Sequence, residues 1–304
     1  MIKSLTVTNP TGESIRLELT RPEKSGFYIE NIEGLGPANA TVNITESATV
    51  DGGYYTSSHV STRNIVLTLG FLYEKGIEDM RHESYRYFPL KKQIKLLIET
   101  DNRTCVTHGY VESNEPNIFS ERETTQISIL CPDPYFYAFN NGVGYIFNLS
   151  RDIALFSFPF SNESLDEPLI ELGQVTDTTT RIVHNSGDVE IGVKIHIYVK
   201  GSVTTSISID NRTTDQTMTI DTTRLKQITS ADLKEGDEIV INTNKGSKSI
   251  YLISDGTKTN ILNCLSRFTD WIYLLPGDNQ IHHAASDPTN IDITMELEVM
   301  YAGV

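Results

Sequence analysis

The sequence predicts a mainly β protein of two domains: an α+β domain of antiparallel sheet with one helix in residues 1–137, and a β-sandwich in residues 138–304. Three observations lead to this prediction. The chain has 304 residues, which is more than one hydrophobic core usually organises. Apolar and polar residues alternate over much of its length, as in strands with one buried and one exposed face. A helical spacing of apolar residues stands out in one segment, in the first half.

The first half has the patterns of a sheet covered by one helix. Alternating apolar residues predict strands at 65–71, 94–98 and 127–129. Apolar residues within 77–88 share one helical face, and Pro89 ends that helix because proline lacks an N–H and clashes with the preceding turn. The glycine- and proline-containing segment 21–36 indicates a long polar excursion from the sheet.

The second half has only short strands and turns. Strict alternation predicts strands at 193–199 and 291–299, and residues 244–247 predict the turn of a hairpin. The one helical feature expected there is a short turn at 230–233. Many short strands with turn signals between them are typical of a β-sandwich or a jelly roll.

A proline-rich run separates the two halves. Pro132 and Pro134 cannot lie inside a sheet, because each lacks an N–H and has a fixed φ. Tyr135 and Phe136 follow them, and these rings are too apolar for a free linker. We therefore predict a stiff, packed inter-domain hinge at this run.

Composition excludes several classes of protein. The formal net charge is −15, which disfavours binding to nucleic acid by phosphate neutralisation. Cys105, Cys131 and Cys264 have no metal-like spacing and are expected to be buried free thiols. No segment has the length and apolarity of a signal peptide core or a membrane span, so we expect no membrane insertion.

Motifs for catalysis or for metal and cofactor binding are missing from the sequence. His282 and His283 are neighbours on a predicted strand, so they point to opposite faces and indicate surface histidines more than a chelating pair. Cys105 and His108 also fall on opposite faces of a strand, which disfavours a nucleophile and base. We predict no catalytic residue, no cofactor and no metal site.

Two aromatic clusters are candidate binding features. Tyr54 and Tyr55 follow two glycines on a predicted loop tip, where they either pack internally or contact another protein. Trp271 and Tyr273 precede the turn 276–279. Trp271, the only tryptophan, is either a core residue or, with Tyr273, a platform on which a sugar ring stacks.

Twelve short motifs follow one another along nearly the whole chain. They are NIEGLGP at 31–37, DGG at 51–53, RNIVLTL at 63–69, YFPLK at 87–91, GYVE at 109–112, QISI at 126–129, CPDPYF at 131–136, FPF at 158–160, NSGD at 185–188, KGSK at 245–248, LPGDN at 275–279 and YAGV at 301–304. In this order they resemble the distal tail protein (Dit) family of long-tailed phages of Gram-positive hosts and related prophages.

The resemblance implies a structural hub of the phage tail tip or baseplate. It implies an N-terminal ring-forming (belt) domain and a C-terminal galectin-like β-sandwich from about Ala138 onward, with the segments 21–36 and 51–55 protruding from the first domain. Six copies would form a ring, single or as two stacked rings, through whose lumen DNA passes. The ring would join the tail-tube protein to tail-tip (tail-associated) proteins and carry receptor-binding or baseplate proteins.

The same resemblance implies a virion protein that is assembled in the host cytoplasm and is not an enzyme. Acidic residues of the first domain are then expected to face the lumen, where they would not retain DNA. One alternative is a carbohydrate-binding module that contacts host cell-wall glycans through Trp271 in the sandwich. A second alternative, a wall hydrolase, requires a carboxylate pair that the sequence spacing does not reveal.

Overall fold

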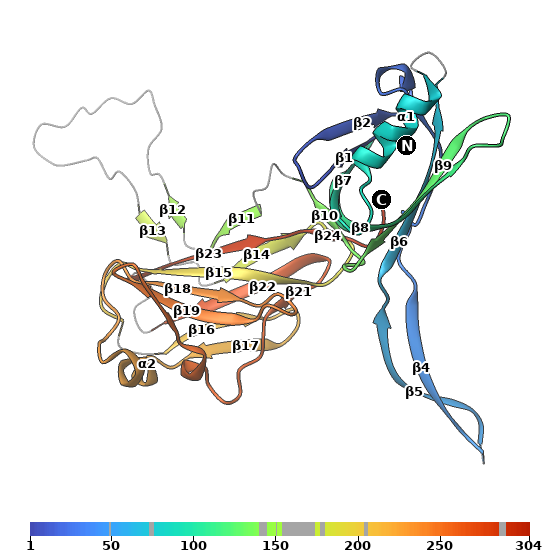
Figure 1. Ribbon diagram of the computed structural model, residues 1–304. Coiled ribbons are helices and arrows are strands. Elements are labelled where there is room, and N and C mark those ends of the chain that lie inside the picture. The colour runs from blue at the N-terminus through green and yellow to red at the C-terminus, as the bar shows by residue number, and fades with distance from the viewer. Residues whose placement is uncertain are drawn as a thin grey trace, which may run out of the picture. The chain divides into compact units, whose positions relative to one another are not determined.

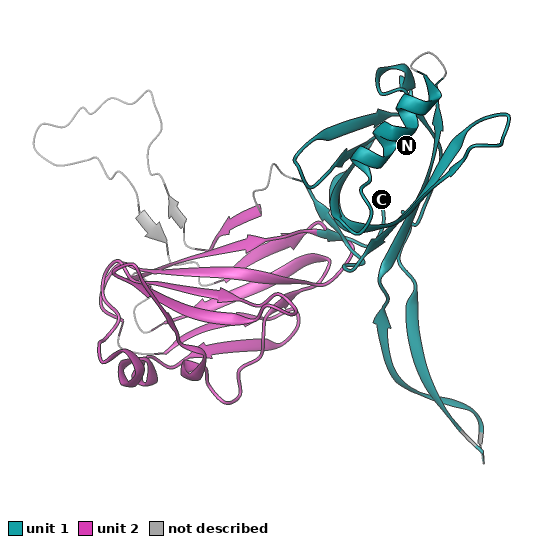
Figure 2. Cartoon of the chain, in the orientation of Figure 1, with its two compact units in different colours: residues 1–142, 300–304 teal, residues 143–299 magenta. Residues whose placement is uncertain are grey.

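The computed structural model describes residues 1–48, 50–72, 76–139, 145–149, 151–153, 174–176, 180–203, 206–285 and 290–304. The protein is mainly β, as predicted, and the chain divides into two compact units (Figure 2). Unit 1 is Met1–Gly142 together with Met300–Val304, and unit 2 is Val143–Val299. The sequence motif at 158–160 lies outside the described residues.

Unit 1 is built on one antiparallel sheet (Figure 1). Its strands lie in the order β2 (Ser14–Glu18), β1 (Ile2–Thr8), β7 (Gln93–Thr100), β8 (Thr104–Asn117), β9 (Thr124–Cys131), β6 (Arg63–Phe71) and β3 (Phe27–Glu33). A short strand, β10 (Phe136–Ala138), pairs with β8 and with β24 (Met300–Tyr301). The last residues of the chain therefore belong to unit 1, although the sequence assigned them to the second domain.

The predicted helix is confirmed as α1 (Ile77–Tyr87). Its buried residues are Met80 and Ser84, and the Ser84 hydroxyl accepts a hydrogen bond from Asn114 Nδ2 of β8 at 3.4 Å. The chain leaves the helix at Phe88, whose N–H still donates to the Ser84 carbonyl at 2.9 Å before Pro89 prevents another turn. The helix thus packs through one narrow face.

The predicted excursion at 21–36 is wrong. After the 3₁₀ turn η1 (Pro22–Lys24), the strand β3 pairs with β6, and the buried ring of Phe27 lies 5.9 Å from that of Phe71. The register of this pair shifts between Ile29 and Asn31. Such a bulge breaks the alternation of period two, which is why the segment did not resemble a strand.

Unit 2 is a sandwich of two antiparallel sheets (Figure 1). The larger sheet has the order β11 (Tyr145–Asn148), β23 (Ile291–Leu297), β15 (Ile191–Val199), β18 (Glu238–Asn242), β19 (Ser249–Ser254) and β20 (Thr257–Asn260), with β21 (Tyr273–Leu274) paired to β15. The smaller sheet has the order β14 (Thr180–Asn185), β22 (Gly277–Ala284), β16 (Ile207–Asn211) and β17 (Gln216–Ile220). The strands β12 (Arg151–Ile153) and β13 (Gln174–Thr176) form a separate pair.

The core of unit 2 follows from the alternation seen in the sequence. Buried residues occupy every second position of β15 from Val193 to Val199 and of β23 from Ile291 to Leu297. The predicted hairpin turn at 244–247 is confirmed between β18 and β19. The apolar faces of the two sheets thus supply one shared core.

The helical turn expected at 230–233 is misplaced. The structure has instead the helix α2 (Thr222–Thr229), followed by the 3₁₀ turn η3 (Leu262–Cys264) farther along the chain. The Asp221 side chain caps α2 by accepting from Thr223 N at 3.0 Å, and Ser230 ends the helix with φ 58°. Threonine-rich segments have weak helix propensity, so the one usable signal was the aspartate cap.

Candidate functional site

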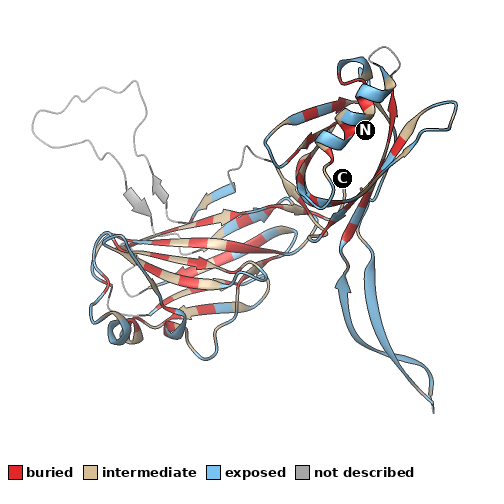
Figure 3. Ribbon diagram, in the orientation of Figure 1, coloured by how far each residue is buried: buried red, intermediate tan, exposed pale blue. Residues whose placement is uncertain are grey.

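A two-stranded hairpin projects from unit 1 and carries the tyrosines singled out in the sequence. It consists of β4 (Ala40–Ser47) and β5 (Val50–Val60), and we call it the arm. The arm is inserted between β3 and β6 and extends beyond the main sheet (Figure 1). Its described side chains are exposed along its whole length (Figure 3).

One face of the arm is apolar. In the antiparallel register Ala40 lies opposite Val60, Val42 opposite Ser58, and Ile44 opposite Tyr55, so these pairs share a face. A register shift between Asn43 and Ile44 brings Tyr55 onto this face. The exposed fractions of its larger side chains are 53% for Val42, 60% for Ile44, 66% for Tyr55 and 38% for Val60.

The other face of the arm is polar. Its side chains form cross-strand hydrogen bonds from Asn43 Nδ2 to Ser57 Oγ at 2.9 Å and between the hydroxyls of Thr45 and Thr56 at 3.0 Å. Tyr54 lies opposite Thr45 on this face and is 65% exposed. The arm is therefore an amphipathic ribbon.

An isolated ribbon of this kind needs a partner to be stable. Two strands without a third strand or a covering layer are only marginally stable in water. Within the described residues no further strand pairs with β4 or β5. Residues 40–60 contain no lysine or arginine, and their carboxylates are those of Glu46 and Asp51. Few charges and exposed aromatic and aliphatic side chains are typical of the core of a protein–protein interface.

The root of the arm is held by a buried arginine. Arg63, the first residue of β6, is 2% exposed, and its guanidinium donates to the carbonyl oxygens of Gly34 at 2.5 Å and of Gly36. It also donates to the carbonyls of Pro134 at 2.7 Å and Ala302 at 2.6 Å. Burial lowers the pKa of Arg63. One side chain thus ties together the chain entering the arm, the strand leaving it, the proline run and the C-terminal segment.

The predicted hinge residues lie within unit 1. Phe136 is fully buried, with the Arg63 guanidinium carbon 4.2 Å from the centre of its ring. The Asp133 carboxylate accepts from Tyr135 N at 3.0 Å, and Pro134 supplies a carbonyl to Arg63. Pro132 is exposed. Phe136 and Pro134 are thus packed against Arg63, whereas the stiffness of the run and its role as an inter-domain hinge stay predictions.

Unit 1 has further exposed apolar side chains that sequence reasoning missed. At the loop between β8 and β9, Ile118 is 44% and Phe119 is 97% exposed. Tyr110 and Leu130 lie directly opposite each other on the same two strands and are also exposed. The sequence signal for this exposure was the adjacent apolar pair Ile118 and Phe119 within an otherwise polar loop, where the side chains have no core to enter.

In unit 2, Trp271 and Tyr273 are neither fully buried nor fully exposed, so the core position considered for Trp271 is not found. The ammonium of Lys248 lies 5.2 Å from the centre of the Trp271 ring and 5.3 Å from that of Tyr273. Lys245 lies 5.5 Å from the Tyr273 ring. The two aromatic side chains are thus partly exposed beside cationic groups.

The histidines and cysteines do not assemble a reactive site. His283 is buried, so its expected surface position is wrong, and no group of three metal-ligating side chains occurs within the described residues. Cys105 is buried and His108 is exposed, as expected for opposite faces of a strand. Burial raises the pKa of Cys105 to about 11, which keeps the thiol protonated and unreactive.

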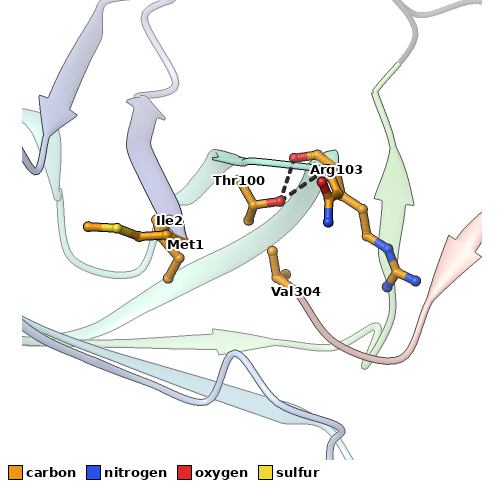
Figure 4. A pocket seen from close by; sticks show the side chains of 6 residues that line it. Met1, Ile2, Thr100, Arg103 and Val304 are labelled. Carbon is orange, nitrogen blue, oxygen red and sulfur yellow. Dashed lines mark hydrogen bonds between the residues drawn. The ribbon is translucent and has the colours of Figure 1, made fainter.

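A shallow hollow in unit 1 has a volume of about 390 Å³ (Figure 4). It is lined by Met1, Ile2, Thr100, Asn102, Arg103 and Val304. The Thr100 hydroxyl accepts a hydrogen bond from the N–H of Arg103 and donates one to its carbonyl, each at 3.0 Å. The Met1 ammonium pairs with the Asp101 carboxylate at 2.6 Å. This lining has no pair of groups suited to acid–base or nucleophilic chemistry.

The described part of the chain has no helix long and apolar enough to cross a membrane. Comparison with curated protein sequences gave no significant match. Residues 186–297 match the family described as siphovirus-type tail component, C-terminal domain.

Solved structures extend the comparison to the whole chain. The SPP1 Dit protein, described as a paradigm of the hub adsorption apparatus in Gram-positive infecting phages, matches with a TM-score of 0.58 at 13% identity over 96% of this chain and 98% of its own. A chain of the phage P2 baseplate in its activated conformation with Ca matches with a TM-score of 0.42 at 13% identity, over 98% of this chain and 99% of its own. A chain of the same baseplate with Sr matches with a TM-score of 0.40 at 12% identity, over 97% of this chain and 98% of its own. The family match and the SPP1 Dit fold confirm the resemblance to distal tail proteins.

Proposed function

We propose that this chain, with its siphovirus tail component domain and its SPP1 Dit fold, is the structural hub of a phage tail tip or baseplate. The proposal rests on the match of residues 186–297 to a family that is described as a siphovirus-type tail component. The whole-chain fold match supports it by extending the likeness to unit 1. A virion location, after assembly in the host cytoplasm, follows from the same role.

In this proposal unit 1 forms a hexameric ring. Copies in a ring meet head to tail, so each must carry two different surfaces that fit each other. Unit 1 has several separate apolar surfaces: the arm face with Ile44 and Tyr55, the loop with Phe119, and the pair of Tyr110 and Leu130. We propose that the apolar arm face packs against one of the other two surfaces on a neighbouring copy. A stable contact of this kind buries about 1,000 Å² or more.

The ring would join the tail-tube protein to tail-tip proteins and carry receptor-binding or baseplate proteins. DNA would pass through its lumen, and the net charge of −15 would limit its adhesion there. The packed run around Pro134 and Phe136 would form a stiff start to the connection between the ring-forming part and the galectin-like sandwich.

Size-exclusion chromatography with light scattering, followed by negative-stain imaging, tests the ring. We expect six chain masses, or twelve for two stacked rings, and a particle with a central opening. A protein that stays monomeric at high concentration would contradict the proposal.

A pair of variants in β4 tests the role of the arm. Ile44→Asp places a charge on the apolar face and should shift the protein to monomers. Asn43→Asp makes a similar change at the neighbouring position on the polar face and should leave the ring intact. If both variants assemble like the parent protein, the arm face is not the ring contact.

A further inference from the structure

A group of aromatic and cationic side chains on unit 2 has no role in the proposed ring. We call Trp271, Tyr273, Lys245 and Lys248 the lysine–aromatic patch. Trp271 and Tyr273 are two residues apart, while Ile272 between them is fully buried, so the two aromatic side chains share the outer face of an extended segment. Both are partly exposed. They therefore present adjacent aromatic surfaces to solvent.

The backbone under the two rings is fixed. The N–H of Tyr273 donates to Gln216 Oε1 at 2.9 Å, and its carbonyl accepts from Asn211 Nδ2 at 2.7 Å. Just before Trp271, the N–H of Asp270 donates to the carbonyl of Thr217 at 2.8 Å. A platform that is already ordered loses little conformational entropy when a ligand binds.

The two lysines give the patch a positive charge within an acidic protein. They lie on the turn between β18 and β19. Lys248 extends over both rings, at 5.2 and 5.3 Å, and Lys245 extends over the Tyr273 ring at 5.5 Å. Lys245 is paired with Glu190 at 3.1 Å, whereas Lys248 makes no ion pair with any described residue. A cation–π contact at an exposed site contributes only about 0.5–1 kcal/mol, so the Lys248 ammonium is free to turn toward an anion.

We propose that the lysine–aromatic patch binds an anionic glycan, meaning a polysaccharide that carries phosphate or carboxylate groups. The apolar face of a sugar ring would stack on Trp271 or Tyr273, since these rings offer large rigid surfaces with a polar edge. The anionic substituent would pair with Lys248 and, next to it, Lys245. A neutral sugar would contact only the aromatic rings and would gain nothing from the two ammonium groups. The positive charge of the lysines therefore favours an anionic glycan over a neutral one.

Binding by the full chain can be followed directly, because Trp271 is its only tryptophan and its fluorescence reports the patch. The probes are oligogalacturonate and its methyl ester, and phosphorylated dextran and plain dextran. We expect the two anionic probes to change the emission and to bind at least tenfold more tightly than their neutral counterparts. The carboxylate and phosphate probes together show which anion is preferred.

Variants separate the patch from nonspecific charge effects. Lys248→Gln and Trp271→Ala should each weaken binding, measured by calorimetry, by at least tenfold, and Trp271→Phe should retain part of it. Lys258→Gln is the matched control, because Lys258 lies 3.9 Å from the ring centre of Tyr251 on the same sheet but outside the patch. Its affinity should not change.

Any one of the following probe or variant results would overturn the proposal: no binding of either anionic probe, equal binding of the neutral probes, or an equal loss in Lys258→Gln. Tighter binding of a single-stranded oligonucleotide that depends on the same residues would also overturn it. Unchanged circular dichroism and melting of each variant would show that lost binding is not lost folding. None of these results depends on whether the protein forms a ring.

Discussion

Replacing Arg63 by methionine tests whether the buried guanidinium holds unit 1 together. Methionine has a similar length and apolar stem but no donors. The change removes hydrogen bonds to the carbonyls of Gly34, Gly36, Pro134 and Ala302. These carbonyls belong to three segments that are far apart in the sequence, and one guanidinium reaches all of them. Its removal therefore breaks the links between all three segments at once.

The size of the effect follows from the contacts. Each of the four bonds contributes about 1 kcal/mol, because the partner residues are partly exposed and water regains access to the oxygens. The lost contact with the Phe136 ring adds about 1–2 kcal/mol. Burial lowers the pKa of Arg63, so burial of this charge is unfavourable, and removing the charge offsets a smaller part of the loss. We expect unit 1 to lose about 4–5 kcal/mol of unfolding free energy.

Urea unfolding of the full chain separates the two units. Circular dichroism follows both units, whereas the fluorescence of Trp271 follows unit 2 alone. Arg63→Met should move the unit 1 transition to lower urea. It should also lower the melting temperature of unit 1 by about 10 °C, at about 2–4 °C per kcal/mol. Lys in place of Arg63 should recover only part of the loss, since an ammonium has three donors and no planar surface.

The control is Arg16→Met. Arg16 pairs with Glu99 at 2.6 Å, but its side chain is 53% exposed, and an exposed pair contributes about 0–1 kcal/mol. If Arg63→Met and Arg16→Met destabilise unit 1 equally, the clamp argument is wrong.

Other predictions test the local geometry. Gly34→Ala should lower the unfolding free energy of unit 1 by more than about 2 kcal/mol, because φ is +82° and the new Cβ would lie 2.0 Å from a backbone oxygen of β6. The control is Gly12→Ala, where φ is +87° but the space is open, and it should lower the unfolding free energy by only about 1 kcal/mol in the same urea experiment. Glu13→Gln should lower the melting temperature near neutral pH. The hydrogen bond from Arg86 lowers the pKa of Glu13 from its usual 4.5, so this contribution is present above that value and is lost as pH falls through the lowered pKa. A deficit that stays constant as the pH is lowered stepwise below 4.5, until the protein unfolds, would contradict that assignment. Cys105 should resist a thiol reagent near pH 8 until urea unfolds unit 1, because burial raises its pKa to about 11; rapid labelling of the native protein would contradict its burial.

Local sequence patterns determined much of the secondary structure. The alternation at 193–199 and 291–297 identified two central strands, and the apolar spacing before Pro89 identified α1. These features depend on side-chain periodicity and backbone sterics within a few residues, so a single sequence contains them. The same local rules failed at β3, where a bulge interrupts the alternation, and at α2, whose threonines favour other conformations.

The candidate sites were only partly visible in the sequence. Tyr54 and Tyr55 were recognised as a binding feature, but the arm that carries them was not, because alternation shows which residues share a face and not whether another layer covers it. The exposed Phe119 and the lysines beside Trp271 were missed for the same reason. Exposure is a property of the packed molecule.

The sequence by itself determined that the chain is mainly β, through its periodicity, and the order of its motifs revealed the resemblance to distal tail proteins. Only the tertiary structure decided that Arg63 joins the root of the arm to Pro134 and Ala302, and that β24 returns to pair with β10 in unit 1. Such contacts join residues far apart in the chain. Their energy comes from burial and hydrogen bonding that exist only once the sheets have packed, so no local pattern encodes them.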